Sequence, residues 1–264
     1  MRKVVPNTDF VKMMLVGRSG STKTRTAYSA CIDPDQRLGR VLGLDMMGQP
    51  RSIAEYKPQP DIIGIDALSE LSEVYNWLKG GQKENDPFVK KMYGLGMELK
   101  PPYGCLVPDG WSEAQRHIVA LASGNTFRAP GDKPSAVEIQ HYNTILAQTL
   151  AMVELFYRLP IHVISTCLEQ EREDKKLGTV NRLQLVGQSR DQLASYPEIV
   201  GRMQHIEKIP STLKAALEEV TPETVSVCFF KPSPRYEAKD QTGKLGDYMV
   251  DPTIEKILNL IANT

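Results

Sequence analysis

The sequence has no excess of charge of either sign. Its 264 residues include 32 Lys and Arg and 32 Asp and Glu, so the formal net charge is zero. A protein that holds nucleic acid or an anionic membrane mainly through its overall field needs a basic excess. Any contact with DNA would therefore have to come from local basic loops, or from an assembly that concentrates them.

Cysteines are few and scattered. The four residues Cys31, Cys105, Cys167 and Cys228 include no CxxC pair and lie far apart in the sequence. This spacing gives no support to a zinc site and does not resemble a disulfide framework. We expect reduced, mostly buried thiols.

Long hydrophobic runs are also missing. No stretch of about 18 apolar residues exists, which excludes a transmembrane helix. The opening "MRKVVPNTDF" lacks the apolar run of a signal peptide. We therefore expect a cytoplasmic protein with no membrane partner.

Short apolar runs do occur, and they alternate with segments in which apolar residues have helical spacing. Strands are predicted at "FVKMMLVG" (10–17), "RVLGLD" (40–45) and "DIIGID" (61–66), and helices at "TKTRTAYSACI" (22–32) and "ALSELSEVYNWLK" (67–79). This alternation favours an α/β fold with a mostly parallel central sheet flanked by helices. At this length we expect a single domain spanning 1–264.

The pattern loosens between residues 80 and 134, where turn signals such as "GGQKENDP", "KPPYG" and "APGDKP" dominate. One helix is expected there, at "WSEAQRHIVALAS" (111–123). We interpret 80–134 as a loop-rich, irregular insertion in the core, either functional or a surface decoration. Beyond it we expect a long helix (135–159), a strand (160–167), a charged protruding hairpin (169–188), two further strands (198–209 and 224–230) and a terminal helix (251–264).

The most informative motif follows the first strand. A phosphate-binding loop has the pattern G-x-x-x-x-G-K-[ST] between a strand and a helix. Here it comprises Gly17, Arg18, Ser19, Gly20, Ser21, Thr22, Lys23 and Thr24. Thr22 stands where the motif has glycine, and a β-branched side chain hinders close backbone approach to phosphate. The spacing and the strand–helix context still favour a nucleotide site, with Lys23 on the phosphates and Thr24 on magnesium.

Several other polar residues end strands or begin helices. Asp66 ends "DIIGID" and is predicted to hold magnesium, the alternative being a cap on the next helix. Asp45, Glu70 and Glu73 are candidates to orient or activate water, although the two glutamates also fit a solvated helix face. Thr166 ends "HVIST" and is predicted to sense the γ-phosphate, or else to bond a neighbouring loop.

The order of these motifs carries a family resemblance. The phosphate loop, "VLGLD", "IIGIDALSEL", "LPIHVISTCLEQERED", "LVGQSRDQLASYPEIVGRM" and "RYEAKDQTGKL" together resemble the phage-encoded RecA/RadA-like ATPases of the Sak single-strand-annealing group. The resemblance implies a RecA-like P-loop core that binds ATP and Mg²⁺, assembles into a homo-oligomeric ring or filament, and acts on single-stranded DNA in phage recombination or replication. It places Lys23, Thr24 and Asp66 at the nucleotide.

The same resemblance suggests roles for later residues. Lys239 in "EAKD" would act as a cation on the nucleotide of a neighbouring subunit, with Arg235 as a second candidate. The hairpin 169–188 lies where such proteins place DNA-facing loops, but its acidic residues offset its basic ones and it lacks an aromatic residue for base stacking. Localisation would be the cytoplasm of the host cell.

Three departures from the family pattern concern catalysis. They are Thr22 in the loop, methionines after Asp45 where a carboxylate is usual, and "STCLE" without the usual histidine. We expect nucleotide binding to survive them and hydrolysis to be slow or absent. Two functions stay open: a DNA-dependent ATPase in recombination, or a nucleotide-binding structural or assembly module with little hydrolysis.

Overall fold

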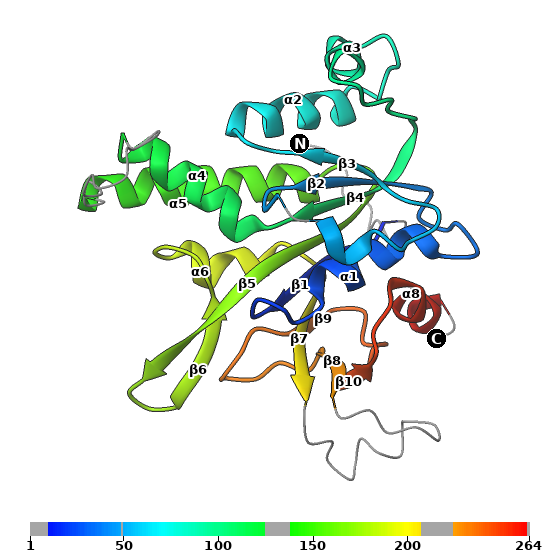
Figure 1. Cartoon of the computed structure of the whole chain (residues 1–264). Helices are drawn as coiled ribbons and strands as arrows, with labels where there is room; N and C mark the ends of the chain where they lie inside the picture. The colour runs from blue at the N-terminus through cyan, green and yellow to red at the C-terminus, as the bar shows by residue number, and fades with distance from the viewer. Residues whose placement is uncertain (1–9, 49, 125–137, 207–223, 263–264) are drawn as a thin grey trace, which may run out of the picture.

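A computed structural model describes residues 10–48, 50–124, 138–206 and 224–262. Its strands form one sheet of ten, in the order β10-β8-β7-β1-β5-β4-β2-β3, with β6 paired to β5 and β9 paired to β7 (Figure 1). The strands are β1 (Lys12–Gly17), β2 (Arg40–Asp45), β3 (Asp61–Gly64), β4 (Tyr103–Asp109), β5 (His162–Asp174), β6 (Gly178–Leu183), β7 (Ile199–Ile206), β8 (Val225–Phe229), β9 (Lys239–Asp240) and β10 (Tyr248–Val250).

The helices fill the connections between these strands. They are α1 (Lys23–Tyr28), η1 (Ser29–Ile32), η2 (Pro50–Ile53), α2 (Leu68–Lys79), α3 (Pro87–Gly94), α4 (Trp111–Ala122), α5 (Ile139–Tyr157), α6 (Ser189–Gln192), η3 (Leu193–Ser195) and α8 (Ile254–Ala262). The strands β7, β1, β5, β4, β2 and β3 pair in parallel, whereas β6, β8, β9 and β10 pair antiparallel. The predicted mixed α/β fold with a mostly parallel sheet flanked by helices is confirmed.

The sheet separates two hydrophobic cores. Alternate side chains of a strand point to opposite faces, and in β1 Met14 and Val16 join one core while Met13 and Leu15 join the other. The first core includes residues of α2, α4 and α5, and the second includes residues of α1 and α8. Figure 1 shows α1 and α8 close together near β1, away from α4 and α5. The central strands are thus buried on both faces, which explains their continuous apolar runs.

The segment predicted as an insertion contains a central strand, so that part of the prediction is wrong. β4 lies between β2 and β5 in the sheet, and its residues Cys105, Leu106 and Val107 are fully buried. Turn-forming residues surround this short apolar run, with Pro101 and Pro102 before it and Gly110 after it, and they concealed it. The helix expected at 111–123 is present as α4, and residues 125–137 lie outside the described residues.

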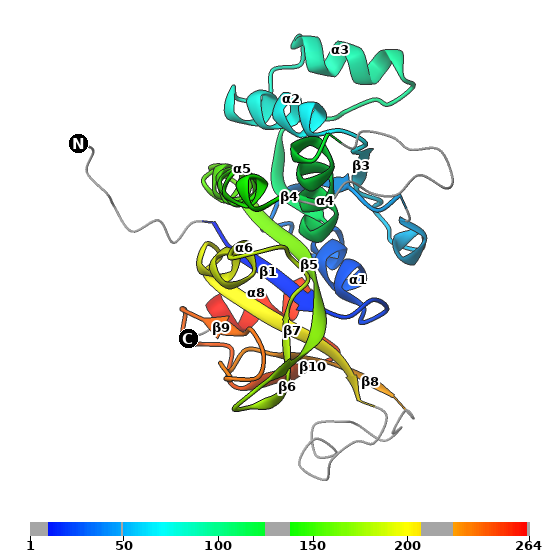
Figure 2. The ribbon, with the colours of Figure 1, turned by 90° about the vertical axis from the view of Figure 1, so that its left-hand side faces the viewer.

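The charged hairpin is present and projects from the sheet (Figures 1 and 2). β5 continues beyond the sheet and pairs with β6 from Glu169↔Leu183 to Asp174↔Gly178. Its outer part, residues 171–179, is exposed to solvent. A long β-ribbon that leaves the sheet has few apolar contacts, so its position depends on polar contacts near its base.

The cysteines and the lengths of the helices can also be compared with what the sequence predicts. All four cysteines are free, three of them buried and Cys31 partly buried, which confirms the prediction. The longest described helix is α5, with 19 residues. None of the described helices combines the length and apolarity that crossing a bilayer requires.

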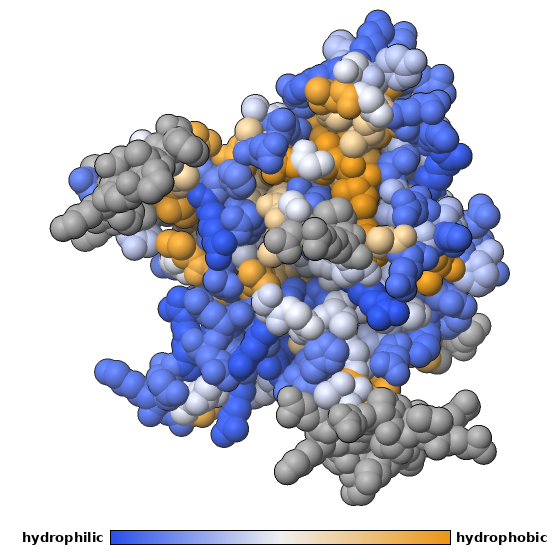
Figure 3. Space-filling view, viewed as in Figure 1, coloured by the Kyte–Doolittle hydropathy of each residue, from blue (hydrophilic) through white to orange (hydrophobic). Residues whose placement is uncertain are grey.

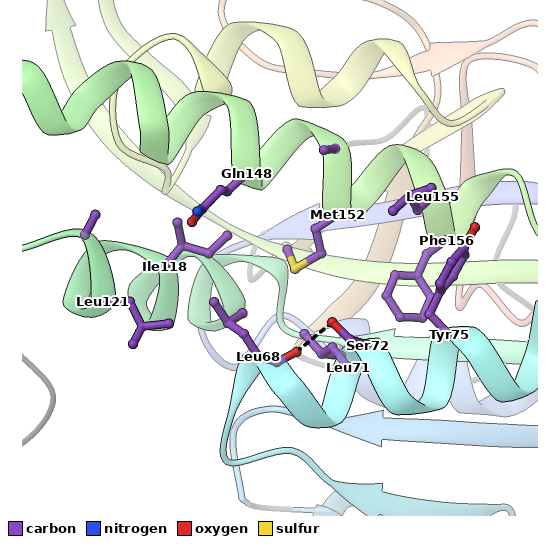
Figure 4. A pocket seen from close by; sticks show the side chains of 12 residues that line it. Leu68, Leu71, Ser72, Tyr75, Ile118, Leu121, Gln148, Met152, Leu155 and Phe156 are labelled. Atoms are coloured by element: carbon purple, nitrogen blue, oxygen red, sulfur yellow. Dashed lines mark hydrogen bonds between the residues drawn. The ribbon is translucent and has the colours of Figure 1, made fainter. Parts of the chain in front are cut away.

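One apolar groove of about 450 Å³ lies between α2, α4 and α5. Figure 3 shows apolar surface gathered on this part of the molecule, and Figure 4 shows Leu68, Ile118 and Met152 pointing into the groove from three different helices. Leu121 and Leu155 at its rim are about half exposed, at 54% and 41%. The groove is lined by helices whose residues belong to the first core, and the loop after β1 takes no part in it.

Candidate functional site

The loop between β1 and α1 has the shape that its glycines require. Gly17 ends β1, and a Cβ atom there would lie 2.5 Å from the Met203 carbonyl oxygen and 2.5 Å from Ser21 Oγ. Gly20 has φ +78°, a left-handed conformation that costs glycine little. The Ser21 N–H donates to the Arg18 carbonyl at 3.2 Å, which closes a tight turn. The loop is therefore compact, and it leads directly into the first turn of α1.

Thr22 adopts an unusual backbone conformation. It has φ 63° and ψ 11°, in the left-handed region, just before α1 begins at Lys23. For a β-branched residue this conformation costs about 1–2 kcal/mol. Two contacts hold it there, since Thr22 Oγ1 donates to the Ser21 carbonyl at 2.7 Å and lies 2.7 Å from Ser226 Oγ on β8. The sequence departure at Thr22 thus leaves the loop path intact and introduces local strain.

Lys23 is buried and folds back over its own loop. Its Nζ donates to the Arg18 carbonyl at 2.7 Å and to Ser21 Oγ at 3.3 Å. Burial lowers the pKa of Lys23 to about 8, against the opposing effect of Cys167, Asp109 and Glu169. A phosphate beside this amine would favour its charged form and so raise the pKa of Lys23 again.

A buried carboxylate that sequence reasoning missed lies next to this loop. Asp109 ends β4, and its Oδ1 accepts hydrogen bonds from Thr24 Oγ1 at 3.1 Å and Thr166 Oγ1 at 2.5 Å. Burial raises the pKa of Asp109, and these two hydrogen bonds and Lys23 oppose the rise. The signal was present in "CLVPD", an apolar run ending in aspartate, but the surrounding prolines and glycines pointed to a loop.

Asp45 lies beside Asp109. The two residues are register partners at the ends of β2 and β4, and both are buried. Asp45 Oδ1 accepts from the N–H groups of Met47 and Gly48, both at 2.9 Å. The negative charge of Asp45 is one of the causes that raise the pKa of Asp109. The structure thus brings Asp45 together with Thr24 and Thr166 around Asp109, and the predicted sensor Thr166 is in contact with this group.

The structure does not bring Asp66 to the loop. Asp66 follows β3, the edge strand, and β2, β4 and β5 lie between β3 and β1, a separation of roughly 19 Å at normal strand spacing. It is exposed, and its N–H donates to Glu70 Oε2 at 2.8 Å. Glu70 Oε2 also accepts from the Ala67 N–H at 3.0 Å. Asp66 and Glu70 therefore belong to the start of α2, which corrects their predicted places at the nucleotide.

Lys239 lies away from the loop along the strand direction. It pairs with Val200 near the start of β7, and Val200 pairs with Met14 of β1. Met14 precedes Gly17 by three residues, which is roughly 10 Å along a strand. Lys239 Nζ donates to the Ser195 carbonyl at 3.2 Å. Within one chain Lys239 is therefore not part of this site, and its action on a neighbouring subunit stays a prediction.

Two hollows border the loop. One, of about 510 Å³, is lined by residues 20–25 with Ser52 and Glu55. The other, of about 520 Å³, lies between the loop, β7 and the hairpin, and its lining includes Arg18, Glu171, Asn181 and Arg235. Both include Gly20 and Ser21. A ligand bound at the loop would therefore have space on either side.

A buried ion pair, also missed by sequence reasoning, forms one wall of the second hollow. Arg202 on β7 contacts Glu169 through Nε–Oε2 at 2.9 Å and Nη2–Oε1 at 3.0 Å. Tyr236 covers the guanidinium, with the ring centroid 4.7 Å away. This fork geometry fixes both side chains, so Glu169 at the base of the hairpin is firmly attached to β7.

The site offers donors that suit a hard divalent cation. Thr24 supplies a hydroxyl and Asp109 a carboxylate, which are oxygen ligands of the kind Mg²⁺ takes together with phosphate and water. No group of three or more His, Cys, Asp or Glu side chains within the described residues forms a metal cage. The residues therefore fit a magnesium ion brought in with a phosphate ligand, rather than one held by protein alone.

Comparisons with known proteins do not assign a function to this site. No family model matches the chain, and no curated protein matches it. Among solved structures, it is similar to the KaiC-like protein PH0186 from the hyperthermophilic archaeon Pyrococcus horikoshii OT3, at 12% identity over 95% of this chain and 99% of that one, with a TM-score of 0.39. This score is too low to transfer a site between the two proteins, so function is inferred from the geometry and the sequence of this chain.

Proposed function

We propose that this protein binds ATP together with Mg²⁺ at the loop of residues 17–24. The observation that carries the proposal is the contact of Thr24 with Asp109, which puts a hydroxyl and a buried carboxylate beside Lys23. Sequence-distant segments supply these groups, from the start of α1 and the end of β4. If the loop motif had arisen by chance, its hydroxyl would not be expected to contact a buried carboxylate at the end of another strand.

The roles follow from the chemistry of each group. Backbone N–H groups of the loop and of the first turn of α1 would bind phosphate oxygens, and Lys23 would neutralise their charge. Thr24 and Asp109 would hold magnesium, which supplies charge compensation on the phosphates. Thr166 keeps Asp109 oriented through its 2.5 Å hydrogen bond, in place of the direct contact with the γ-phosphate that the sequence suggested.

The strand order is consistent with a RecA-like arrangement. The strand before the phosphate loop, β1, lies between β7 and β5. The strand that ends in Asp109, β4, is the neighbour of β5 on the other side. The finer parts of the proposal come from the sequence resemblance: ATP hydrolysis coupled to single-stranded DNA binding or annealing, phage recombination or replication, and assembly of several copies. Lys239 keeps its proposed role at the nucleotide of a neighbouring copy.

A second function is favoured by the surroundings of Asp45. Its Oδ1 already accepts two backbone hydrogen bonds, so this oxygen is less able to take a proton from water. The following residues are Met46 and Met47, which carry no acid–base group. These features favour a nucleotide-binding assembly module that hydrolyses ATP slowly or not at all.

A binding and turnover experiment tests both functions. ATP affinity with Mg²⁺ is measured by calorimetry, and ATP hydrolysis with and without single-stranded DNA, for the wild type and Lys23→Ala. The proposal predicts that Lys23→Ala weakens ATP binding by at least about 10-fold. Equal affinity of the two proteins would refute the site. Binding without turnover, whether or not DNA is present, would select the assembly module over the DNA-dependent ATPase.

The strain at Thr22 gives a separate prediction. Thr22→Gly should raise the free energy of unfolding or leave it unchanged, because about 1 kcal/mol of left-handed strain offsets the entropy cost of glycine. It should also raise ATP turnover if the threonine limits backbone approach to phosphate. Denaturant unfolding and steady-state hydrolysis measure the two effects. Lower stability with lower turnover would show that the contact with Ser226 matters more than the strain.

A further inference from the structure

The phosphate loop is joined to the hairpin by one side chain. Arg18 Nη2 forms an ion pair with Glu171 on β5 and lies 3.5 Å from Asn181 Oδ1 on β6. Glu171 and Asn181 are direct register partners, so the guanidinium bridges one cross-strand pair of the hairpin. Arg18 and Glu171 are both about half exposed, at 54% and 53%. The contact is therefore open to solvent and to any ligand that enters the hollow between loop and hairpin.

The base of the hairpin is fixed separately. The Leu168 N–H donates to Ser112 Oγ at 3.1 Å, and the Val186 N–H donates to Gln115 Oε1 at 2.6 Å. Both partners belong to α4, which follows Asp109 directly. Together with the buried pair of Glu169, these bonds hold both strands where they leave the core, so movement is confined to the outer part of the hairpin.

The outer part has few other attachments. On the β6 side, the Asn181 N–H donates to the Arg235 carbonyl at 2.7 Å, and Arg182 Nη2 donates to the Pro234 carbonyl at 2.8 Å. On the side of the loop, Arg18 makes the hydrogen bonds that join the described residues of the hairpin beyond Glu169 to the loop. The guanidinium of Arg18 therefore sets how the outer β5 strand approaches the loop.

We propose that Glu171 competes with ligand phosphate for Arg18, so that phosphate binding at the loop releases the outer hairpin. This inference rests on the proposed nucleotide site and adds its regulation. Arg18 is the second residue of the loop and lines the same hollow as Gly20, Ser21 and Glu171. A phosphate that reaches Arg18 offers stronger charge-assisted hydrogen bonds than an exposed carboxylate. Glu171 would then face a like charge without its partner, which favours separation of hairpin and loop.

A matched pair of variants tests this competition. Glu171→Gln removes the competing charge, and Glu173→Gln makes the same change two residues along the same strand, where Glu173 Oε1 accepts from Thr179 Oγ1 rather than from Arg18. The affinities for ATP with Mg²⁺ and for inorganic pyrophosphate are measured by calorimetry. We expect Glu171→Gln to bind both about 5-fold more tightly than the wild type, and Glu173→Gln to stay within about 2-fold of it.

Hydrogen exchange gives the second readout. In the wild type, ATP should speed amide exchange in peptides covering 170–183, whereas in Glu171→Gln exchange there should be fast already and should not respond to ATP. Equal affinity changes in both variants, or hairpin exchange that ATP does not alter in the wild type, would overturn the competition while leaving the nucleotide site standing. Failure of the wild type to bind either ligand would instead remove the proposed function, and the competition with it.

Discussion

Asp66, two residues after β3, and Asp109, at the end of β4, both follow short apolar runs, but only Asp109 reaches the phosphate loop. Asp66 follows an edge strand, is exposed, and has its backbone held by Glu70 at the start of α2. Asp109 ends a central strand, is buried, and accepts hydrogen bonds from Thr24 and Thr166. Their local sequences, "IIGID" and "LVPD", are similar. The difference teaches that the position of a strand in the sheet, not its sequence, decides which carboxylate becomes part of the site.

The contrast extends to electrostatics. Around Asp109, burial and the neighbouring Asp45 raise the pKa of the carboxyl group, and Lys23 opposes them. A carboxylate kept in such surroundings costs stability unless a cation joins it. Asp66 remains in solvent, where its charge costs little. Of Asp66 and Asp109, only Asp109 therefore has a physical reason to bind a cation tightly.

The largest expected effect separates the two aspartates directly. Asp109→Asn should weaken binding of ATP in the presence of Mg²⁺ by about 10-fold or more, because a carboxylate ligand is lost. Asp66→Asn should change the affinity by less than about 2-fold, as expected for an exposed charge far from the ligand. Calorimetric titration with and without Mg²⁺ measures both. A larger loss at Asp66 than at Asp109 would reverse the comparison.

Substitution of the same two aspartates should also affect the free energy of unfolding differently. Asp109→Asn should raise the free energy of unfolding of the ligand-free protein near neutral pH, since it removes a buried charge and keeps an acceptor for Thr24 and Thr166. Asp66→Asn should have little effect, because its side chain is exposed. Urea unfolding without nucleotide tests this. Destabilisation by Asp109→Asn would indicate that the carboxylate is structural.

A smaller effect is expected at the start of α2. Glu70→Ala removes the acceptor for the N–H groups of Asp66 and Ala67, and should lower the free energy of unfolding by about 1 kcal/mol. ATP affinity should not change, because this cap lies at the far side of the sheet. Thermal unfolding and ATP titration of one preparation suffice. A matching loss of ATP affinity would restore Glu70 to the site.

The smallest effect concerns pH. Magnesium needs Asp109 ionised, so the affinity for ATP with Mg²⁺ should fall as pH falls through the raised pKa of Asp109. Asp45→Asn removes a neighbouring negative charge, which lowers that pKa, and the loss of affinity should move to lower pH. The amide keeps an acceptor for Met47 and Gly48. Titrations across acidic pH compare the variant with the wild type, and a shift toward higher pH would contradict the coupling.

Local patterns predicted much of the fold. The apolar run before Gly17, the helical spacing after Asp66 and the charged hairpin all formed as expected, because each depends on neighbours in sequence. β4 was not predicted, because a short buried strand among prolines and glycines lacks the flanking pattern of the other strands. The ion pair of Glu169 with Arg202 was not predicted either, because the two residues are 33 positions apart and no local pattern marks such a pair.

The sequence by itself determined the loop: its spacing from Gly17 to Lys23, its strand and helix, and the departure at Thr22. Those features depend on residues that are adjacent along the chain. Only the tertiary structure decided the partners, with Asp109 beside Thr24, Asp45 beside Asp109, and Glu171 against Arg18. Parallel strands align their carboxyl ends in an order that long connections set, so the groups that meet there are chosen by packing of the whole sheet.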